Sequence, residues 1–351
     1  MRRWSSSFKA ISCHGDLPPP PFSKDQLPLK TFPSLTPKKG EVVVSVKVAA
    51  VNFPDVLIAQ GKYQMKPEKE FSPGFEFSGT VKTTGEEVKH LQAGDRVIGF
   101  VPWGAFAEEV SVSRHNLIKM PEGMDFKDGA SLLMAYGTSY YALHHHGAIK
   151  ASDTVLILGA SGGVGLAALE LAKAQGAKVI ATASEDSKLE LCKARGADVL
   201  INYKKDDLKK AMKEVAPEGA DIVYDPVGGD LTETALRNVK WNGRYLVIGF
   251  ASGEIPKIPL NIPLLKGCSI HGVFWGSFAM REPQRLQQQI KSIMELYLAG
   301  KVKPHVSAEY PLEDAYLALN SLAGRKVLNL LSSNFRILCD RRICRRQERC
   351  F

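Results

Sequence analysis

The spacing of apolar residues changes along the chain and marks alternating strands and helices. Residues 154–158 form a short apolar run typical of a buried strand. Several glycines follow, and residues 166–175 then place apolar side chains at helical spacing. Residues 178–182 and 199–202 have the pattern of two further short strands. Strands separated by helices predict a parallel sheet with right-handed crossovers.

The same alternation continues toward the C-terminus. Residues 187–195 and 206–215 are expected to be helices, and residues 221–224 and 244–248 are expected to be strands. The series predicts an α/β fold: a Rossmann-type, doubly wound parallel sheet over residues 134–273.

Between the first strand and its helix lies a glycine-rich turn. Glycine adopts positive φ and lets a ligand approach the backbone, and the N-terminus of a helix favours negative charge. A strand, a glycine turn and a helix in this order are typical of a site for a dinucleotide pyrophosphate. The candidate contacts are Gly159, Ser161, Gly162, Gly163, Val164 and Gly165.

The residues after the second strand indicate which nicotinamide cofactor binds. NAD enzymes usually place an acid there to hold the ribose hydroxyls. Here Ala183 and Ser184 occupy this point, and Lys188 follows one turn later. A hydroxyl and an ammonium favour a 2′-phosphate, whereas Glu185 and Asp186 read as first-turn helix residues. The pattern predicts NADPH, with Lys188 as an ordinary solvated lysine the alternative.

The first third of the chain has a different character. Residues 41–51 are a long β-type run, and short strand-like pieces among Gly and Pro predict a compact β-rich domain. Residues 8–13 are a candidate first strand. Residues 1–15 are rich in Arg and Ser without an acid, which resembles a mitochondrial presequence. We expect a cytoplasmic protein, with a mitochondrial location as the alternative.

Composition and charge narrow the classes of protein. The 351 residues can form two domains, and no apolar run approaches the length of a membrane span, so no membrane partner is expected. Six scattered cysteines do not suggest a disulfide scaffold. The net charge of +9 includes +6 from residues 325–351. A basic tail permits RNA binding, but such tails are more often solvated and disordered.

Six strings in order resemble one family. They are NFPDVLIAQGKY, PGFEFSGTV, AGDRVIGF, AYGTSYYAL, ILGASGGVG and DPVGGD. The chain resembles the zinc-free quinone oxidoreductases among the medium-chain dehydrogenases/reductases. The resemblance implies a GroES-like catalytic domain over residues 1–133, a Rossmann domain over 134–273, a return to the catalytic domain over 274–331, and an atypical basic tail over 332–351. It also implies a homodimer formed through the strand near residues 269–274.

Further cofactor contacts follow from the resemblance alone. Thr138, Tyr203, Phe250 and Phe274 match family positions near the cofactor. An aromatic residue after a strand is also commonly part of the core, so packing is the alternative role for these aromatic side chains.

The resemblance also bears on metal binding. Asn52 stands where metal-dependent relatives have a cysteine ligand, and Phe75 stands where they have a histidine. The consecutive histidines at 144–146 point apart around a helix and read as a solvated helix end. We therefore expect no zinc.

Without a metal, reduction of a polarised quinone or enone needs only positioning and hydrogen bonds to the developing oxyanion. Asn52 and Tyr63 are the candidate catalytic donors, with a turn residue and a rim aromatic as their alternative roles. The predicted function is NADPH-dependent reduction of a small quinone. Reduction of 2-alkenals or other enones, or a weakly catalytic NADPH-sensing or RNA-binding protein, are the alternatives.

The C-terminal end departs from the family. Asn329 and Leu330 replace its Gly-Lys, and residues 332–351 look unrelated to it. From this departure we expect a closing strand and a phosphate-binding lysine to be missing.

Overall fold

A computed structural model describes residues 7–67, 69–324 and 336–339, and the chain divides into two compact units. The first comprises Met1–Met134 and Pro304–Phe351, and the second comprises Ala135–Lys303. The return to the first unit was expected at residue 274, but it begins at Pro304. The intervening segment belongs to the second unit because Trp275 packs against Gly137, whose carbonyl accepts a hydrogen bond from Gln289.

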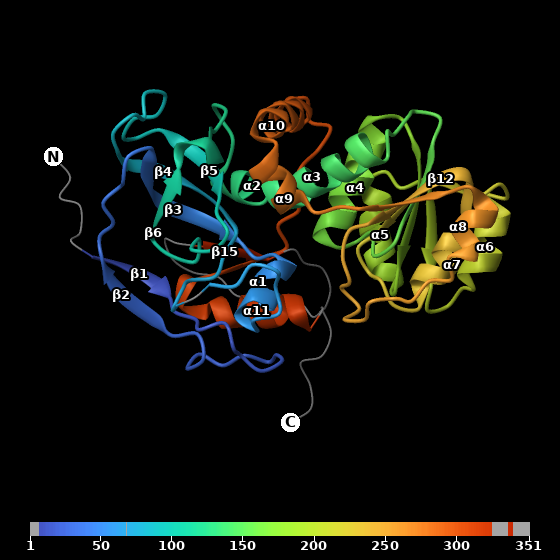
Figure 1. The fold of residues 1–351 in the computed structure, drawn as a ribbon, viewed down its shortest axis with the longest axis horizontal. Coiled ribbons are helices and arrows are strands. Elements are labelled where there is room, and N and C mark those ends of the chain that lie inside the picture. The colour runs from blue at the N-terminus through green and yellow to red at the C-terminus, as the bar shows by residue number, and fades with distance from the viewer. Residues whose placement is uncertain (1–6, 68, 325–335, 340–351) are drawn as a thin grey trace. The chain divides into compact units, whose positions relative to one another are not determined.

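The second unit contains a six-stranded parallel sheet in the order β10-β9-β8-β11-β12-β13. The chain enters at β8 in the centre, builds outward to β10, and returns to place β11 on the other side of β8, which confirms the doubly wound fold. Figure 1 shows α4 and α5 on one face of this sheet and α7 and α8 on the other. The strands are β8 (Thr154–Ile157), β9 (Lys178–Ala183), β10 (Val199–Asn202), β11 (Ala220–Asp225), β12 (Val239–Val247) and β13 (Ser269–Gly272).

Helices connect these strands. They are α3 (Leu133–Tyr140), the π-helical η2 (Tyr141–His146), α4 (Gly163–Ala174), α5 (Asp186–Ala194), α6 (Leu208–Val215), α7 (Leu231–Arg237), α8 (Asn261–Lys266), α9 (Trp275–Arg281) and α10 (Pro283–Leu298). Helices on both faces bury the apolar residues of β8, which are Val155, Leu156 and Ile157. The continuous apolar run at this position therefore reflects a strand that is covered on two sides.

The first unit is built around a seven-stranded sheet in the order β14-β15-β3-β4-β5-β7, with β6 also paired to β3. A separate pair, β1 and β2, is antiparallel. The strands are β1 (Ser7–Ile11), β2 (Leu29–Pro33), β3 (Glu41–Ala50), β4 (Glu76–Thr84), β5 (Arg96–Phe100), β6 (Glu109–Ser113), β7 (Leu117–Lys119), β14 (Ala308–Tyr310) and β15 (Arg336–Cys339). The helices are α1 (Phe53–Ala59), η1 (Arg114–Asn116), α2 (Phe126–Ala130), η3 (Leu312–Asp314) and α11 (Ala315–Ala323).

The long β-branched strand β3 organises this unit. It pairs with β4 along one edge and with β6 and then β15 along the other, and its ladder with β4 has register shifts at Val43/Val44 and Val46/Val48. Irregularities of this kind bend and twist a strand locally. The strand therefore carries two partners on one edge and brings the start of β4 beside the residues that follow Ala50.

The C-terminal strand corrects one expectation. Residues 336–339 lie in the part of the chain that departs from the family, yet they form β15 between β14 and β3. Its register pairs Ile337 with Ala49 and Leu338 with Ala50. The closing strand is therefore present, because any extended segment can supply the backbone hydrogen bonds of a ladder. The remainder of the basic tail and residues 329–330 lie outside the described residues.

Across the described ranges, no helix is long and apolar enough to cross a membrane.

Candidate functional site

The glycine turn joins β8 to α4 at the centre of the parallel sheet. Gly159 has φ of +56°, and its carbonyl accepts a hydrogen bond from the Gly162 amide at 3.0 Å. The Ala160 amide donates to the Thr182 carbonyl at 2.9 Å, which ties the turn to β9. A left-handed residue after a buried strand sends the chain back over the sheet edge, as the sequence pattern predicted.

Close packing explains a second glycine in the turn. A Cβ at Gly165 would lie 2.5 Å from the carbonyl oxygen of Gly159 and 2.8 Å from Cα of Ala160. Helix α4 can approach the turn only because this side chain is absent. A Cβ at Gly162, in contrast, would meet only the Gly159 oxygen at 3.5 Å. Gly162 is exposed, so its missing side chain leaves room for a ligand rather than for the protein.

The first turn of α4 can accept an anion. Gly162 is the N-cap residue and offers no side chain to satisfy the helix amides. The amides at the start of a helix have no partner within the helix and carry the positive end of its dipole. Gly162 and Gly163 are exposed, and Ser161 and Val164 are half-buried. The turn therefore fits a dinucleotide pyrophosphate by the chemistry of its donors and by its open backbone.

Ser184 and Tyr203 follow neighbouring strands, where the adenosine end of a dinucleotide is expected. Asn202 of β10 pairs with Ala183 of β9, and the Tyr203 amide donates to the Ala183 carbonyl at 3.2 Å. Lys188 lies one turn into α5, but its Nζ is 2.6 Å from Oε1 of Glu185. Glu185 is the N-cap residue of α5 rather than a first-turn residue. The structure thus places these candidates together and adds Glu185, which was expected only to favour the helix dipole.

A buried aspartate lies at the end of β11, on the side of β8 opposite β9. Asp225, at the end of β11, accepts hydrogen bonds from the amides of Val227 and Gly228 at 2.8 and 2.9 Å. It also accepts from the hydroxyls of Thr232 and Tyr245 at 2.9 and 2.5 Å. In the sequence this acid is the first residue of the DPVGGD string, and the pattern alone indicates no role for it. The four donors fix the turn after β11.

The aromatic candidates differ in their surroundings. Phe250 packs against this turn, since a Cβ at Gly228 would lie 2.9 Å from its ring, and the amide of Ala251 donates to the Pro226 carbonyl at 3.0 Å. Phe274 follows β13 and is 44% exposed, so it is available to a ligand. Thr138 lies on α3 and is half-buried.

Asn52 and its neighbours form a polar cluster in the first unit. Asn52 Nδ2 donates to Oε1 of Glu76 at 2.9 Å, and the Asn52 amide N–H donates to Oδ2 of Asp55 at 2.7 Å. The other Asp55 oxygen accepts from the Gly74 amide at 2.8 Å, and Oε2 of Glu76 accepts from the Met134 amide at 3.0 Å. The structure therefore surrounds the predicted Asn52 with two carboxyl groups, Asp55 and Glu76, that the sequence pattern did not indicate as site residues.

Both carboxyl groups are buried, with exposures of 0% for Asp55 and 2% for Glu76. Burial raises the pKa of Asp55 to about 8 and that of Glu76 to about 7, against the hydrogen bonds that favour their ionised forms. Pairs of titratable groups in such surroundings are more common in functional sites than elsewhere. A signal was present in the strings NFPD and GFEF, where an acid stands inside an apolar run.

Tyr63 contacts the same region. Its ring packs edge-on against Phe75, with the centroids 5.3 Å apart. Burial, followed by the charge of Asp55, raises the pKa of the Tyr63 hydroxyl. The phenol therefore keeps its proton at neutral pH and can donate a hydrogen bond.

The donor set at this cluster does not fit zinc. Asn52 and Phe75 offer an amide and a phenyl ring where a tetrahedral site needs thiolate or imidazole, which leaves Glu76 as the one ionisable group among these three positions. In the described part of the chain, no group of three or more His, Cys, Asp or Glu side chains could hold a metal ion.

The run of histidines is less solvated than expected. His144 stacks on Tyr140 with the ring centroids 3.8 Å apart, and His146 lies 5.5 Å from the ring of His271. All three histidines are half-buried, and burial lowers the pKa of each. The π-helical turn packs these rings among aromatic neighbours, which the helical spacing alone did not show.

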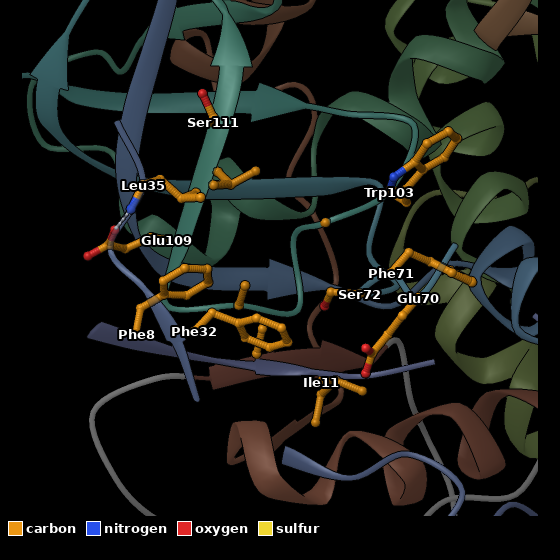
Figure 2. A pocket seen from close by; sticks show the side chains of 14 residues that line it. Phe8, Ile11, Phe32, Leu35, Glu70, Phe71, Ser72, Trp103, Glu109 and Ser111 are labelled. Atoms are coloured by element: carbon orange, nitrogen blue, oxygen red, sulfur yellow. Dashed lines mark hydrogen bonds between the residues drawn. The ribbon is translucent and has the colours of Figure 1, made fainter. Parts of the chain in front are cut away.

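A hollow of about 280 Å³ lies elsewhere in the first unit (Figure 2). Phe8, Phe32, Phe71 and Trp103 give it aromatic walls. Its two carboxylates are already paired within the protein: Glu70 with Lys30 at 2.6 Å, and Glu109 with Lys82 at 2.5 Å. Neither Asn52 nor Tyr63 lines it. The candidate chemistry therefore lies with the Asn52 cluster instead.

Known proteins share these features. Residues 38–122 match the alcohol dehydrogenase GroES-like domain, and residues 163–295 match the zinc-binding dehydrogenase family. The chain is 37% identical to a quinone oxidoreductase-like protein 2 homolog of Nematostella vectensis, over 91% of this chain and 87% of the relative. It is 37% identical to quinone oxidoreductase-like protein 2 of Bos taurus, over 82% of each chain.

Solved structures of other proteins have a similar fold. The quinone oxidoreductase of Escherichia coli, in complex with NADPH, matches with a TM-score of 0.84 and 27% identity, over 94% of this chain and 99% of that one. The match confirms both the Rossmann sheet and the GroES-like unit. The chain therefore belongs to the medium-chain dehydrogenase/reductase superfamily, as an oxidoreductase related to the quinone oxidoreductases.

Proposed function

We propose that the protein uses NADPH to reduce a quinone or a related enone by hydride transfer, without a metal ion. The observation that carries the proposal is the Asn52 cluster. At the position of a metal ligand stands an amide donor, held by Glu76 at 2.9 Å. Alcohol oxidation without a Lewis acid lacks a means to stabilise an alkoxide. Reduction of a conjugated carbonyl needs only donors for the oxygen that gains charge.

The second unit would hold the cofactor. The amides at the start of α4 suit the pyrophosphate, and Ser184 and Lys188 suit a 2′-phosphate. Phe250 and Phe274, which follow β12 and β13, are candidates to contact the nicotinamide, and Tyr203 the adenosine side. When bound, the cofactor supplies the hydride. The E. coli relative in its NADPH complex supports this choice of nucleotide.

The chain's own donors would act on the substrate. The Asn52 amide and the Tyr63 phenol are neutral at pH 7, so each can donate a hydrogen bond to the substrate oxygen. Each donated hydrogen bond stabilises negative charge more than a neutral carbonyl, which accelerates reduction. Replacing Asn52 with Ala should lower kcat more than it raises KM. Tyr63→Phe removes one hydroxyl and keeps the ring packing with Phe75, so it tests the phenol hydrogen bond alone.

The test is oxidation of NADPH and NADH by purified protein. 9,10-Phenanthrenequinone and a 2-alkenal serve as acceptors, and prior treatment with a chelator provides the metal control. We expect faster oxidation of NADPH than of NADH, unchanged by the chelator. The ratio of kcat/KM for the two acceptors separates a quinone reductase from an enone reductase. Absence of oxidation above background with every pair of nucleotide and acceptor would exclude the proposed enzymatic function.

A homodimer is part of this proposal. Strand β13 is an edge of the parallel sheet, and Ile270 on it is 36% exposed. Leu264 and Leu265, on the preceding helix α8, are 78% and 71% exposed. An edge strand that is paired on one side only within the described residues, beside exposed leucines, suits a second copy of the chain. Ile270→Lys should shift the mass measured by light scattering from dimer to monomer, and a wild-type mass of one chain would contradict the dimer.

A further inference from the structure

Glu76 is a buried carboxyl group held by hydrogen bonds. It is 2% exposed and is the first residue of β4. Its hydrogen-bond donors are Nδ2 of Asn52 at 2.9 Å and the backbone amides of Met134, at 3.0 Å, and Leu133. Within the described residues, no lysine or arginine forms an ion pair with it. A buried carboxyl group without an ion pair contributes little to the stability of the fold. Its interaction with Asn52 therefore needs another explanation.

An ionised carboxylate only accepts hydrogen bonds. It therefore selects the nitrogen side of the Asn52 amide and turns the carbonyl oxygen away from itself. One of the two Nδ2 hydrogens is used in this contact, and the other has no acceptor among the described residues. The amide is thus held in one of its two orientations, with one N–H still free to donate.

The backbone of Asn52 is fixed separately. Asn52 is the N-cap residue of α1, and Asp55 accepts its backbone N–H at 2.7 Å. Asp55 also accepts from Gly74, two residues before Glu76. Asp55 therefore ties the start of α1 to the segment that leads into β4, and its own backbone amide faces the Asn52 side chain in a capping box. Glu76 holds the nitrogen of that side-chain amide.

Protonation of Glu76 would change this control. A protonated carboxyl group has one O–H that can donate, and the oxygen of a rotated Asn52 amide can accept it. The two orientations exchange the amide nitrogen and oxygen at the same position. Because burial raises the pKa of Glu76 to about 7, the change falls near neutral pH.

The other titratable and charged groups near Glu76 lie on β4 itself and on the packed elements α1, α2, β3 and β5. Asp55 on α1 is the ionisable neighbour whose pKa responds to the charge of Glu76. Arg96 on β5 lies over the Phe126 ring at 4.5 Å, and Lys127 on α2 pairs with Glu309. The remaining charged side chains on the packed elements are Glu41 and Lys47 on β3, Asp128 on α2 and Lys82 on β4 itself.

We propose that Glu76 is a positioning residue: its ionised carboxylate orients the Asn52 side-chain amide so that one N–H is free for the substrate oxygen, and its protonation releases that orientation. The inference rests on the proposed reductase function for its kinetic consequence. The orientation of the amide can be measured without turnover.

The kinetic test compares wild type, Glu76→Gln, Asn52→Ala and the double variant between pH 5.5 and 9. In wild type, kcat should rise as pH increases through about 7. Glu76→Gln places a donor beside the amide and cannot ionise, so kcat should fall about tenfold, the value of one hydrogen bond in the transition state, and lose this pH dependence. In the Asn52→Ala background, Glu76→Gln should have no further effect. Additive losses, or an unchanged pH profile, would overturn the proposal.

Glu109→Gln is the matched control. Glu109 is also buried, at 6% exposure, and lies on β6 of the same unit, paired with Lys82 at 2.5 Å. This control should lower thermal stability and leave the pH profile of kcat unchanged. NADPH affinity, measured by fluorescence, should be the same in all folded variants.

A second measurement separates failure of this inference from failure of the proposed function. In protein labelled with ¹⁵N-asparagine, the Asn52 side-chain signals, assigned through Asn52→Ala, should titrate near pH 7 in wild type and not in Glu76→Gln. If the wild type lacks reductase activity but shows this titration, the function fails and the coupling stands. If the Asn52 signals do not respond to pH, the positioning role is wrong whatever the activity.

Discussion

Lys188 and Glu185 form an ion pair at the point where the cofactor's 2′-phosphate is expected. Lys188 Nζ lies 2.6 Å from Oε1 of Glu185, and the Lys188 side chain is 19% exposed whereas that of Glu185 is 53% exposed. The two residues are three positions apart at the start of α5. A phosphate that binds Lys188 must therefore compete with a carboxylate already in place.

This relationship predicts opposite effects of two substitutions on NADPH binding. Lys188→Ala removes a charge-assisted hydrogen bond, so the Kd for NADPH should rise by roughly ten- to a hundredfold. Glu185→Gln removes the competing charge and should lower that Kd. The Kd for NADH, which lacks the phosphate, should change little in either variant. Fluorescence titrations with both nucleotides provide the measurement, and equal changes for NADPH and NADH would show that Lys188 does not bind the phosphate.

Two glycines of the turn should separate folding from binding. A Cβ at Gly165 would lie 2.5 Å from the Gly159 oxygen, so Gly165→Ala should lower the melting temperature and the affinity together. Gly162→Ala has room within the protein, and an N-cap Gly→Ala change costs roughly 0.5–1 kcal/mol. It should keep stability near wild type while its methyl group weakens nucleotide binding. Unchanged NADPH affinity in Gly162→Ala would place the pyrophosphate elsewhere.

The local patterns of the chain predicted β8 to β11 well, because these strands lie in short apolar runs between glycines or charges, whereas β12 begins at Val239 and not at the predicted residue 244. Strand β9 extends one residue beyond the predicted 178–182, and β10 matches the predicted 199–202. The polar partners of the site were harder to predict. Glu185 acquires its role from its contact with Lys188. Glu76 acquires its role from its contact with Asn52, which lies 24 positions away in the sequence.

Two other features also depend on distant contacts. Strand β15 comes from a segment without family resemblance, since a ladder recruits it through backbone hydrogen bonds. Asp225 looked like one letter of a turn motif, yet it accepts hydrogen bonds from four donors, including the Tyr245 hydroxyl on the next strand. Periodicity describes which face of an element is buried, but it does not show which polar groups meet there.

The Asp225 network should stabilise the turn after β11. Asp225→Ala leaves the buried hydroxyls of Thr232 and Tyr245 without their acceptor, so the free energy of unfolding should fall by about 3 kcal/mol. Tyr245→Phe removes one donor and keeps the packing, and should cost about 1 kcal/mol. Urea denaturation of both variants measures these values. A loss for Asp225→Ala no larger than that for Tyr245→Phe would mean that the other donors contribute nothing.

Asp55 should make the stability of the protein depend on pH in the direction opposite to ordinary acids. Burial raises the pKa of Asp55 from 3.8 to about 8, so the folded state holds a proton that the unfolded state has lost. Wherever the folded state binds more protons, the free energy of unfolding falls as pH rises. For Asp55 this window extends from about pH 4 to about pH 8.

The comparison between pH 7 and pH 8.5 isolates Asp55, because Glu76, with a pKa of about 7, contributes mainly below that range. Wild-type stability in urea should decrease between these two values. Asp55→Asn cannot ionise, so its stability should be nearly constant there, whatever its absolute level. Glu76→Gln serves as the control: it should keep the decrease above pH 7 and lose part of the slope below it. If Asp55→Asn retains the wild-type slope above pH 7, Asp55 is already ionised in the folded protein, and the Asn52 backbone is held by a charged carboxylate.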